Sequence, residues 1–555
     1  MPTDPIPGEP LYDVLVVGAG FSGLYMLHRL RSMGLRALVL ERGSAVGGTW
    51  YWNRYPGARC DVESVDYCYS FSDALLREWT WTERYPPQPE ILRYLEHVAD
   101  RFDLKRDIRF GTTVSAARYD ESAARWVLST GDGHALQARF CVMATGNLSM
   151  AKRPDIPGLD RFEGEWFHTG HWPHHPVDLK NRRVAVVGTG SSGIQVITTI
   201  APDVARMYVL QRTPNYSMPA WNRPLAPSEL AATVAHYPAR REACRESDPG
   251  IPLSPPTRRA VEVTAEERRR RYEEGWRRGG VPALSFAFTD MFTSEESNRY
   301  AQDFARGKIT ALVEDPAVAR RLSPVHHIGT KRTCVDTGYF ETYNRSNVEL
   351  IDLRTQPIDC ISATGIRVGD RHIPLDVIVF AVGFDAITGA LTAIDIQGRG
   401  GVPLRAKWST GPRTLLGLQT AGFPNLFMVT GPGSPSVLSN MVISIEQHVD
   451  WIADCIAHLR HRGADTIEPT AEAEDRWTAH VDTLAAATLY PQANSWYVGA
   501  NIPGKPRTFS VYVGGCGAYR DECRRVVAEG YRGFRIIRQD STGGPPLPAA
   551  SRAAG

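Results

Sequence analysis

Two glycine-rich loops constrain the fold of this chain more than any other feature. They are Gly18–Gly23 (GAGFSG) and Gly188–Gly193 (GTGSSG), and each follows a short apolar run and precedes residues at helical spacing. Such runs are typical of parallel strands buried on both faces. The glycines allow a tight turn and close approach to a pyrophosphate, while the helix N-terminus offers unpaired N–H groups. The sequence therefore predicts an α/β fold with two dinucleotide-binding, Rossmann-like domains.

The alternative for either loop is an ordinary glycine-rich turn. Against it, the first loop has a strand, a helix, a second strand and a terminal acid in the expected order. The predicted cofactor contacts are Gly18, Gly20 and Gly23 in the first loop and Gly188, Thr189, Gly190, Ser191, Ser192 and Gly193 in the second.

The residue that ends the second strand distinguishes the two units. Glu41 lies 23 residues after Gly18, where an acid can bind a ribose 2′-hydroxyl and would repel a 2′-phosphate. Arg212 lies 24 residues after Gly188 and is followed by Thr213. An arginine there can bind a 2′-phosphate bidentately, and a threonine can add a hydroxyl; the alternative is a surface arginine at a strand end. The contrast predicts FAD in the first unit and NADPH in the second.

A loop dense in aromatic residues follows the first unit. Residues 47–61 (GGTWYWNRYPGARCD) combine aromatics with turn residues, so we expect a structured loop rather than a regular helix. Its position after an FAD-type unit favours packing against a flavin. The alternative is a loop fixed to the core by Trp50, Trp52 and Tyr55. Further along, we expect a helix over residues 89–102 and a β-meander of strands at 108–114, 125–129 and 136–143.

Residues 216–330 differ in character and predict a helical insertion in the second domain. Thr264-x-x-Glu267 is a capping box that opens an arginine- and glutamate-rich helix ending at Arg278. Its charge run is typical of a solvated helix face. His326 and His327 are adjacent, but no carboxylate or cysteine stands nearby at a ligand spacing, so we predict no metal site.

Composition argues against several classes of partner. The 555 residues carry a formal net charge of +2, with 43% apolar and 22% charged residues, which gives no electrostatic case for nucleic acid or an anionic membrane. No run of about 18 apolar residues suggests a membrane span. Nine cysteines are scattered without a CxxC pair, as in a protein with reduced thiols. We expect a cytoplasmic protein, and its oligomeric state stays open, with a monomer compatible.

The motifs predict how the chain is divided. Residues 1–146 and 386–540 are expected to bind FAD, residues 147–215 and 331–385 to bind NADP, and residues 216–330 to form the insertion. The end, residues 541–555, is rich in Pro, Gly and Ala and is expected to be disordered.

A longer pattern lies between the two glycine loops. It reads Phe-x-Gly-x-x-x-His-x-x-x-Trp-Pro and is carried by Phe162, Gly164, His168, Trp172 and Pro173. Two further strings accompany it, GTW running into YPGARCD over residues 48–61 and KR followed by DTGYFETYNR over residues 331–345. Together they resemble the type I Baeyer–Villiger monooxygenases, class B flavoprotein monooxygenases that insert one oxygen atom beside a ketone carbonyl. The resemblance runs from about residue 12 to residue 538 and is closest to the phenylacetone and steroid monooxygenase group.

The resemblance implies FAD and NADPH as cofactors, with a ketone and O2 as the other reactants. The family's flavin contacts correspond to Ser22, Glu41, Thr49, Trp50, Asp61, Tyr67, Val114 and Met441, its NADP contacts to Arg212, Thr213, Lys331 and Trp496, and its substrate-lining loop to Ser436, Val437 and Leu438.

The implied reaction starts when NADPH reduces the flavin and O2 adds at the flavin C4a carbon. The resulting peroxide stays deprotonated and attacks the ketone through a tetrahedral adduct, which gives an ester or a lactone. Arg332, a permanent cation, is expected to stabilise the negative oxygens, and Asp61 to orient Arg332 by a charge-assisted bond. His168 and Trp172, from their linker position, are expected to couple domain movement to catalysis.

Three rival hypotheses accompany this interpretation. An N- or S-oxygenating flavin monooxygenase shares both nucleotide folds, but Asp61 and Arg332 disfavour it. A disulfide reductase needs a redox cysteine pair near the flavin, and Cys60 and Cys68 are too far apart in sequence for the usual motif. A dinucleotide-binding sensor would keep the glycines without needing Arg332. The sequence leaves the ketone open among bulky, cyclic, aryl and steroidal substrates.

Overall fold

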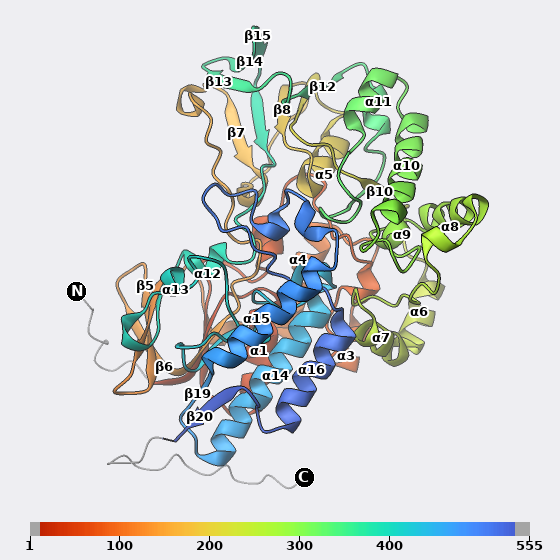
Figure 1. Ribbon diagram of the computed structural model, residues 1–555. Helices are drawn as coiled ribbons and strands as arrows, with labels where there is room; N and C mark the ends of the chain where they lie inside the picture. The colour runs from red at the N-terminus through yellow and green to blue at the C-terminus, as the bar shows by residue number, and fades with distance from the viewer. Residues whose placement is uncertain (1–10, 539–555) are drawn as a thin grey trace.

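The computed structural model describes residues 11–538 and contains two large sheets (Figure 1). The predicted disordered tail, residues 541–555, lies outside the described residues. The first sheet has eight strands in the order β17-β4-β5-β6-β1-β2-β3, with β18 also paired to β6. These strands are β1 (Tyr12–Val17), β2 (Ala37–Leu40), β3 (Ile108–Arg109), β4 (Val114–Asp120), β5 (Arg125–Thr130), β6 (Ala135–Met143), β17 (Asp395–Gln397) and β18 (Leu426–Met428).

The centre of this sheet is parallel and buried on both faces. β1 pairs in parallel with β2 and β6, and its alternate residues enter different cores. Val14 and Val16 pack with α1 (Phe21–Ser32) and α14 (Met441–Arg462), whereas Leu15 and Val17 pack on the other face. An apolar strand without alternation is the expected sequence for such a position. α3 (Asp73–Glu78), α4 (Gln88–Arg101), α15 (Ala471–Ala486) and α16 (Cys516–Ala528) complete this half.

The second sheet has five parallel strands in the order β12-β9-β8-β16-β7. They are β7 (Glu165–His168), β8 (Arg183–Val187), β9 (Arg206–Gln211), β12 (Val348–Asp352) and β16 (Val377–Phe380). Val184 and Val186 pack against α5 (Ser191–Ile200) on one face. The neighbouring strands carry a small antiparallel meander of β13 (Ile358–Ser362), β14 (Gly365–Val368) and β15 (Arg371–Pro374).

Residues 227–322, within the expected insertion, hold six α-helices. The helices are α6 (Pro227–Ala235), α7 (Tyr237–Glu246), α8 (Ala265–Arg278), α9 (Pro282–Ser285), α10 (Glu295–Leu312) and α11 (Pro316–Leu322). The Thr264 hydroxyl caps α8 by accepting from the Glu267 N–H at 3.2 Å, but the Glu267 carboxylate pairs with Arg271 instead of closing the capping box. α10 and α11 lie beside the five-stranded sheet, whereas α7 lies beside α16 of the other half (Figure 1).

One local expectation is wrong, and the aromatic loop proves to hold a single helical turn. Residues 108–114 do not form one strand, because the chain turns at Gly111 with φ +64°. The N–H groups of Gly111 and Thr112 donate to the carbonyls of Gly43 and Glu41, so β3 pairs in parallel with β2 at the edge of the sheet and the meander starts only at β4. In the aromatic loop, Gly48 has φ +52° and the next residues close a single helical turn, α2 (Thr49–Trp52).

The remaining elements are short. They are β10 (Ser217–Pro219) paired with β11 (Cys334–Asp336), β19 (Thr466–Pro469) paired with β20 (Phe534–Ile537), α12 (Gly389–Thr392) and α13 (Leu404–Lys407). Over residues 11–538, no helix is long and apolar enough to cross a membrane.

Candidate active site

The first glycine loop has the geometry of a pyrophosphate cradle. Gly18 has φ +107°, and a Cβ there would lie 2.6 Å from the carbonyl oxygen of Ala144, so no side chain fits between the two strands. α1 starts after Gly20 without a side-chain cap, which leaves its first N–H groups free for an anion. Ser22 and Gly23 lie in that first turn and are buried. These features fit the pyrophosphate of FAD.

Glu41 stands at the carboxyl end of β2 and is buried. Its two oxygens accept from the N–H groups of Ala19, at 2.7 Å, and Gly43, at 2.6 Å. A carboxylate offers about four lone-pair positions, so Glu41 retains acceptor capacity for a ribose hydroxyl. The backbone bonds hold it against the glycine loop.

The other predicted flavin residues surround this loop. Thr49 is exposed at the start of α2, and the indole Nε1 of buried Trp50 donates to the Tyr67 hydroxyl at 3.2 Å. Val114 starts β4 and packs in the same cluster as Val17. Met441, the first residue of α14, is half-buried at the edge of the first core.

The second glycine loop repeats the first. Gly188 has φ +109°, a Cβ there would lie 2.4 Å from the carbonyl oxygen of Ala381, and α5 starts after Gly190 without a side-chain cap or an acid in its first turn. That turn carries Ser191, Ser192 and Gly193. These features fit a second pyrophosphate.

Two cations lie beside the second loop. The Thr189 hydroxyl donates to the Thr213 carbonyl at 3.0 Å, which places exposed Arg212 and Thr213 at the rim of the loop. Burial lowers the pKa of Lys331, and the charge of nearby Arg212 lowers it further. Within residues 11–538, no carboxylate forms an ion pair with either cation. Two neighbouring cations without a carboxylate fit a phosphate group.

The predicted catalytic pair is assembled between the two halves. Arg332 donates from Nε to Asp61 Oδ2 at 2.9 Å and from Nη2 to Asp61 Oδ1 at 2.8 Å, and Nη1 donates to the Val437 carbonyl at 2.8 Å. Burial alone would lower the pKa of Arg332, but the charge and hydrogen bonds of Asp61 outweigh burial and raise it. The structure therefore joins the aromatic loop, the Lys331–Arg332 segment and the predicted substrate loop at one guanidinium.

The substrate loop forms the 3-10 turn Ser436–Leu438. Ser436 has φ +44°, is buried, and accepts a hydrogen bond from Asn147 Nδ2, so its hydroxyl shapes the loop. Val437 packs in an apolar cluster. The members of that cluster are Ala386, Ile387, Val437, Ala485, Tyr490, Tyr497, Val498, Phe509 and Val511, with Leu438, Met441 and Trp496 packed against it. Burial raises the pKa of Tyr497 to about 12, and the charge of Arg332 opposes that rise, which places Tyr497 beside the guanidinium.

The pattern Phe162–Pro173, called the fingerprint below, is not a free linker between the two glycine loops, because part of it is the edge strand β7, paired with β16. His168 is buried at its end, and Nδ1 accepts from the Gly170 N–H at 2.9 Å. Burial, with a smaller effect from His171, lowers the pKa of His168 to about 4, so the ring is neutral at pH 7. Phe162 and Trp172 are buried, and a Cβ at Gly164 would lie 2.5 Å from the Asp376 carbonyl oxygen. Half-buried Pro173 follows.

After β7, the fingerprint meets the aromatic loop of the first half. The ring of His171 lies 6.1 Å from that of Trp52, and the ring of His174 lies 4.6 Å from that of Tyr51. Nearby, the Tyr55 hydroxyl donates to Gln195 Oε1 on α5 at 2.8 Å. The two halves therefore meet through both motifs.

Sequence reasoning missed several residues of this region. Asn147 directly follows the Ala144–Gly146 turn, which is a signal that could have identified it. Gln195 and Tyr497 carry no signal in the sequence that separates them from ordinary helix and core residues.

Known proteins are similar to this chain over nearly its whole length. The family model for pyridine nucleotide-disulphide oxidoreductases matches residues 15–248. An acetone monooxygenase (methyl acetate-forming) from Gordonia sp. (strain TY-5) is 42% identical over 527 residues, which cover 94% of this chain and 99% of the relative. A phenazine N-monooxygenase from Lysobacter antibioticus is 40% identical over 533 residues, 95% of this chain and 97% of the relative. The solved structure of an oxidized steroid monooxygenase bound to NADP superposes with a TM-score of 0.92 at 53% identity, covering 96% of this chain and 100% of that one.

Proposed function

Since this chain belongs to the Baeyer–Villiger monooxygenases, we propose that it uses FAD, NADPH and O2 to insert one oxygen atom beside the carbonyl of a ketone, giving an ester or a lactone. Reduced FAD supplies the activation of O2. The residues of the chain bind the two dinucleotides, exclude water and stabilise negative charge on oxygen.

One observation carries the proposal, the fixation of Arg332 between Asp61 and the Val437 carbonyl. A guanidinium stays charged at every working pH. Three of its five N–H groups are used by these partners, so one N–H on each Nη atom is available for a further oxygen acceptor. A preoriented cation of this kind stabilises the negative charge that develops on oxygen during the insertion. Asp61 fixes the orientation, and its charge keeps the site close to neutral overall.

The cofactor assignment follows the two loops. Residues 1–146 and 386–540 bind FAD through the Gly18–Gly23 loop, Glu41 and the residues around Tyr67. Residues 147–215 and 331–385 bind NADPH through the Gly188–Gly193 loop, and Arg212 and Lys331 bind its 2′-phosphate. The lack of any ion pair to these two cations, among the residues that the structure describes, supports this assignment.

The side chains of the apolar cluster beside Arg332 are aliphatic and aromatic. The cluster therefore favours as substrate a ketone whose surface away from the carbonyl is apolar. Ser436, Val437 and Leu438 line this side of the site. The protein acts in the cytoplasm, and its reactants are the ketone and O2, with no nucleic acid and no membrane.

A second candidate is an N- or S-oxygenating activity, which the similarity to a phenazine N-monooxygenase favours. An amine or thioether has no carbonyl oxygen on which negative charge develops, so Arg332 would contribute less to that reaction. Loss of Arg332 therefore separates the two candidates.

The proposal is tested by supplying the purified holoenzyme with NADPH and either ketones or tertiary amines and thioethers. Arg332→Met should slow ester formation from ketones by about 10²–10³-fold, while flavin reduction by NADPH keeps its wild-type rate. Ester formation at the wild-type rate in this variant would remove Arg332 from catalysis.

A further inference from the structure

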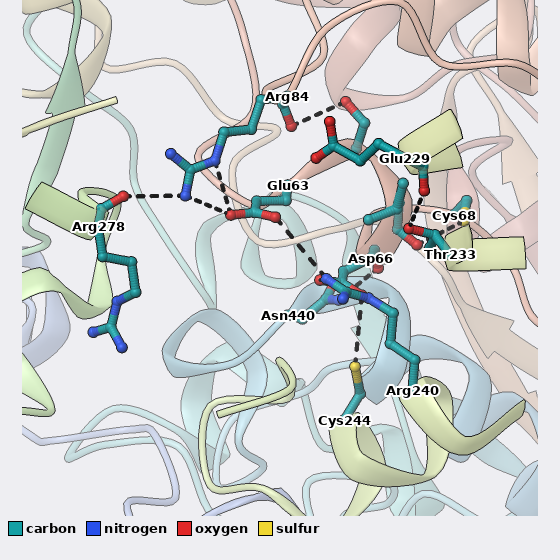
Figure 2. A network of polar contacts seen from close by, with 12 residues as sticks. Glu63, Asp66, Cys68, Arg84, Glu229, Thr233, Arg240, Cys244, Arg278 and Asn440 are labelled. Carbon is teal, nitrogen blue, oxygen red and sulfur yellow. Dashed lines mark hydrogen bonds and ion pairs between the residues drawn. The ribbon is translucent and has the colours of Figure 1, made fainter. Parts of the chain in front are cut away.

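Two adjacent arginines of α7 bind the short segment Asp66–Cys68 of the first half. Arg240 donates from Nε to Asp66 Oδ1 at 2.7 Å and from Nη2 to Asp66 Oδ2 at 2.6 Å. Arg241 donates from Nη1 to the Asp66 carbonyl at 3.0 Å and from Nη2 to the Cys68 carbonyl at 2.5 Å. Figure 2 shows Arg240, Cys244 and Asn440 gathered around Asp66. The insertion thus holds this segment through both side-chain and backbone atoms.

Arg241 and Asp66 are buried and Arg240 is half-buried, unlike most charges of the insertion. Arg241 is 1% exposed and Asp66 is 2% exposed. By contrast, Arg270 and Glu274 on α8 form a pair with side chains 60% and 50% exposed. A buried guanidinium is costly unless nearby groups satisfy its donors and charge. The Glu446 carboxylate of α14 lies 3.4 Å from Arg241 Nη2 and supplies that charge.

Tyr67 stands between the two carbonyls that Arg241 binds. Its hydroxyl accepts from Trp50 Nε1, and its ring lies edge-on to Phe21, the first residue of α1, with 5.2 Å between ring centroids. The charges of Asp61 and Arg332 both reach the Tyr67 hydroxyl, whose pKa is raised mainly by burial. Tyr67 therefore sits where the first glycine loop, the aromatic loop and the Arg332–Asp61 pair meet.

The same segment also fixes the start of α14. Asn440 Nδ2 donates to the Asp66 carbonyl at 2.7 Å, while Asn440 Oδ1 caps α14 by accepting from the Val442 N–H at 3.1 Å. The Asp66 carbonyl is thus shared by α7 and the cap of α14. Met441, which packs at the edge of the apolar cluster beside Arg332, follows the cap directly.

We propose that Arg240 and Arg241 are positioning residues that hold Tyr67 and the start of α14 against the flavin. This rests on the proposed function, in which the first glycine loop binds FAD. The insertion then takes part in the flavin site from a distance, by fixing the peptide groups on both sides of Tyr67. A change at either arginine should therefore weaken the binding of FAD and shift its absorption bands, even though neither side chain is expected to touch the flavin.

The test uses holoenzyme carrying Arg241→Met, Arg241→Lys or Arg240→Gln, with Arg270→Met as the matched control. Lysine keeps the charge of Arg241 but cannot span two carbonyls with a planar fork. We expect Arg241→Met to raise the FAD dissociation constant by about tenfold or more, as for loss of a hydrogen bond from a charged group. Its flavin absorption bands should shift, and a larger share of the NADPH consumed should yield H2O2. Arg240→Gln should change the same three quantities to a smaller extent. Arg241→Lys should restore less than half of the FAD affinity that Arg241→Met loses, and Arg270→Met should match wild type.

A double variant separates positioning from charge neutralisation. Arg241→Met/Glu446→Gln also removes the negative charge that the single variant leaves without its cation, so it should fold even where the single variant does not. We expect it to keep the weakened FAD binding and the raised H2O2 share. Wild-type FAD binding and coupling in the double variant would overturn the proposal, because Arg241 would then serve only to neutralise Glu446. A wild-type enzyme that oxygenates no ketone would instead refute the proposed function, while FAD binding would still decide the role of the arginines.

Discussion

Asp61 should act in catalysis only through Arg332, which makes a double-mutant cycle on this pair decisive. The variants are Asp61→Ala, Arg332→Met and the double variant. Arg332 uses two N–H groups on Asp61 and one on the Val437 carbonyl. Without Asp61, the guanidinium keeps its charge but only one of its three fixed contacts. Without Arg332, Asp61 has no cation to orient.

The geometry sets the expected magnitudes. Loss of a preoriented donor to a developing oxyanion costs about 10²–10³ in kcat, which is our expectation for Arg332→Met. Asp61→Ala should cost slightly less, about 10²-fold, because the Val437 contact still holds the guanidinium. Asp61→Asn retains one acceptor oxygen toward Arg332 and should lower kcat by about tenfold.

The assay measures ester formation at saturating ketone, and stopped-flow reduction of the flavin by NADPH serves as the internal control. If Asp61 acts through Arg332, the double variant should be no slower than Arg332→Met. Losses that multiply in the double variant would refute this reasoning, because Asp61 would then have a role of its own. A fall in the rate of flavin reduction in any of the three variants would also contradict the assignment.

Three further predictions concern other parts of the chain. Arg212→Ala should raise the KM for NADPH by about 10–100-fold and that for NADH far less, and an equal effect on both would contradict the phosphate assignment. His448 is fully buried, and burial lowers its pKa from 6.5 to about 3. As the pH falls below 6.5, this histidine therefore binds a proton in the unfolded chain but stays neutral in the native one. The free energy of unfolding should fall over this range, and His448→Asn should reduce the slope by up to about 1.4 kcal/mol per pH unit; an unchanged slope would refute the neutral buried ring. Gly57 has φ +80°, and a Cβ there would lie 2.0 Å from Thr199 Oγ1 on α5. Gly57→Ala should therefore lower the free energy of unfolding by about 1–3 kcal/mol or more. An unchanged melting temperature would contradict this packing.

The parts that sequence reasoning predicted depend on short-range patterns. The two strand–glycine loop–helix units are local, and β1 and β8 end directly before Gly18 and Gly188, where the apolar runs predict strands. The strand expected over 108–114 is wrong because one residue, Gly111, takes a left-handed φ, which composition does not reveal.

The parts that local sequence patterns cannot predict depend on contacts between distant segments. Arg332 and Asp61 are 271 residues apart, and only the family resemblance joined them in advance. α7 and α8 are both rich in arginine and glutamate, yet Arg241 is buried, whereas every arginine of α8 is exposed or half-buried. The difference arises from partners near residues 66 and 446, which no pattern within α7 can indicate.

The most direct test of the central claim is to supply the purified protein with NADPH, ¹⁸O2 and a panel of cyclic, aryl and steroid ketones, and to analyse the products by mass. We expect NADPH oxidation that a ketone accelerates, and an ester or lactone that carries one ¹⁸O atom. NADPH oxidation that no ketone accelerates, together with labelled N-oxides or sulfoxides from amines or thioethers, would contradict the claim.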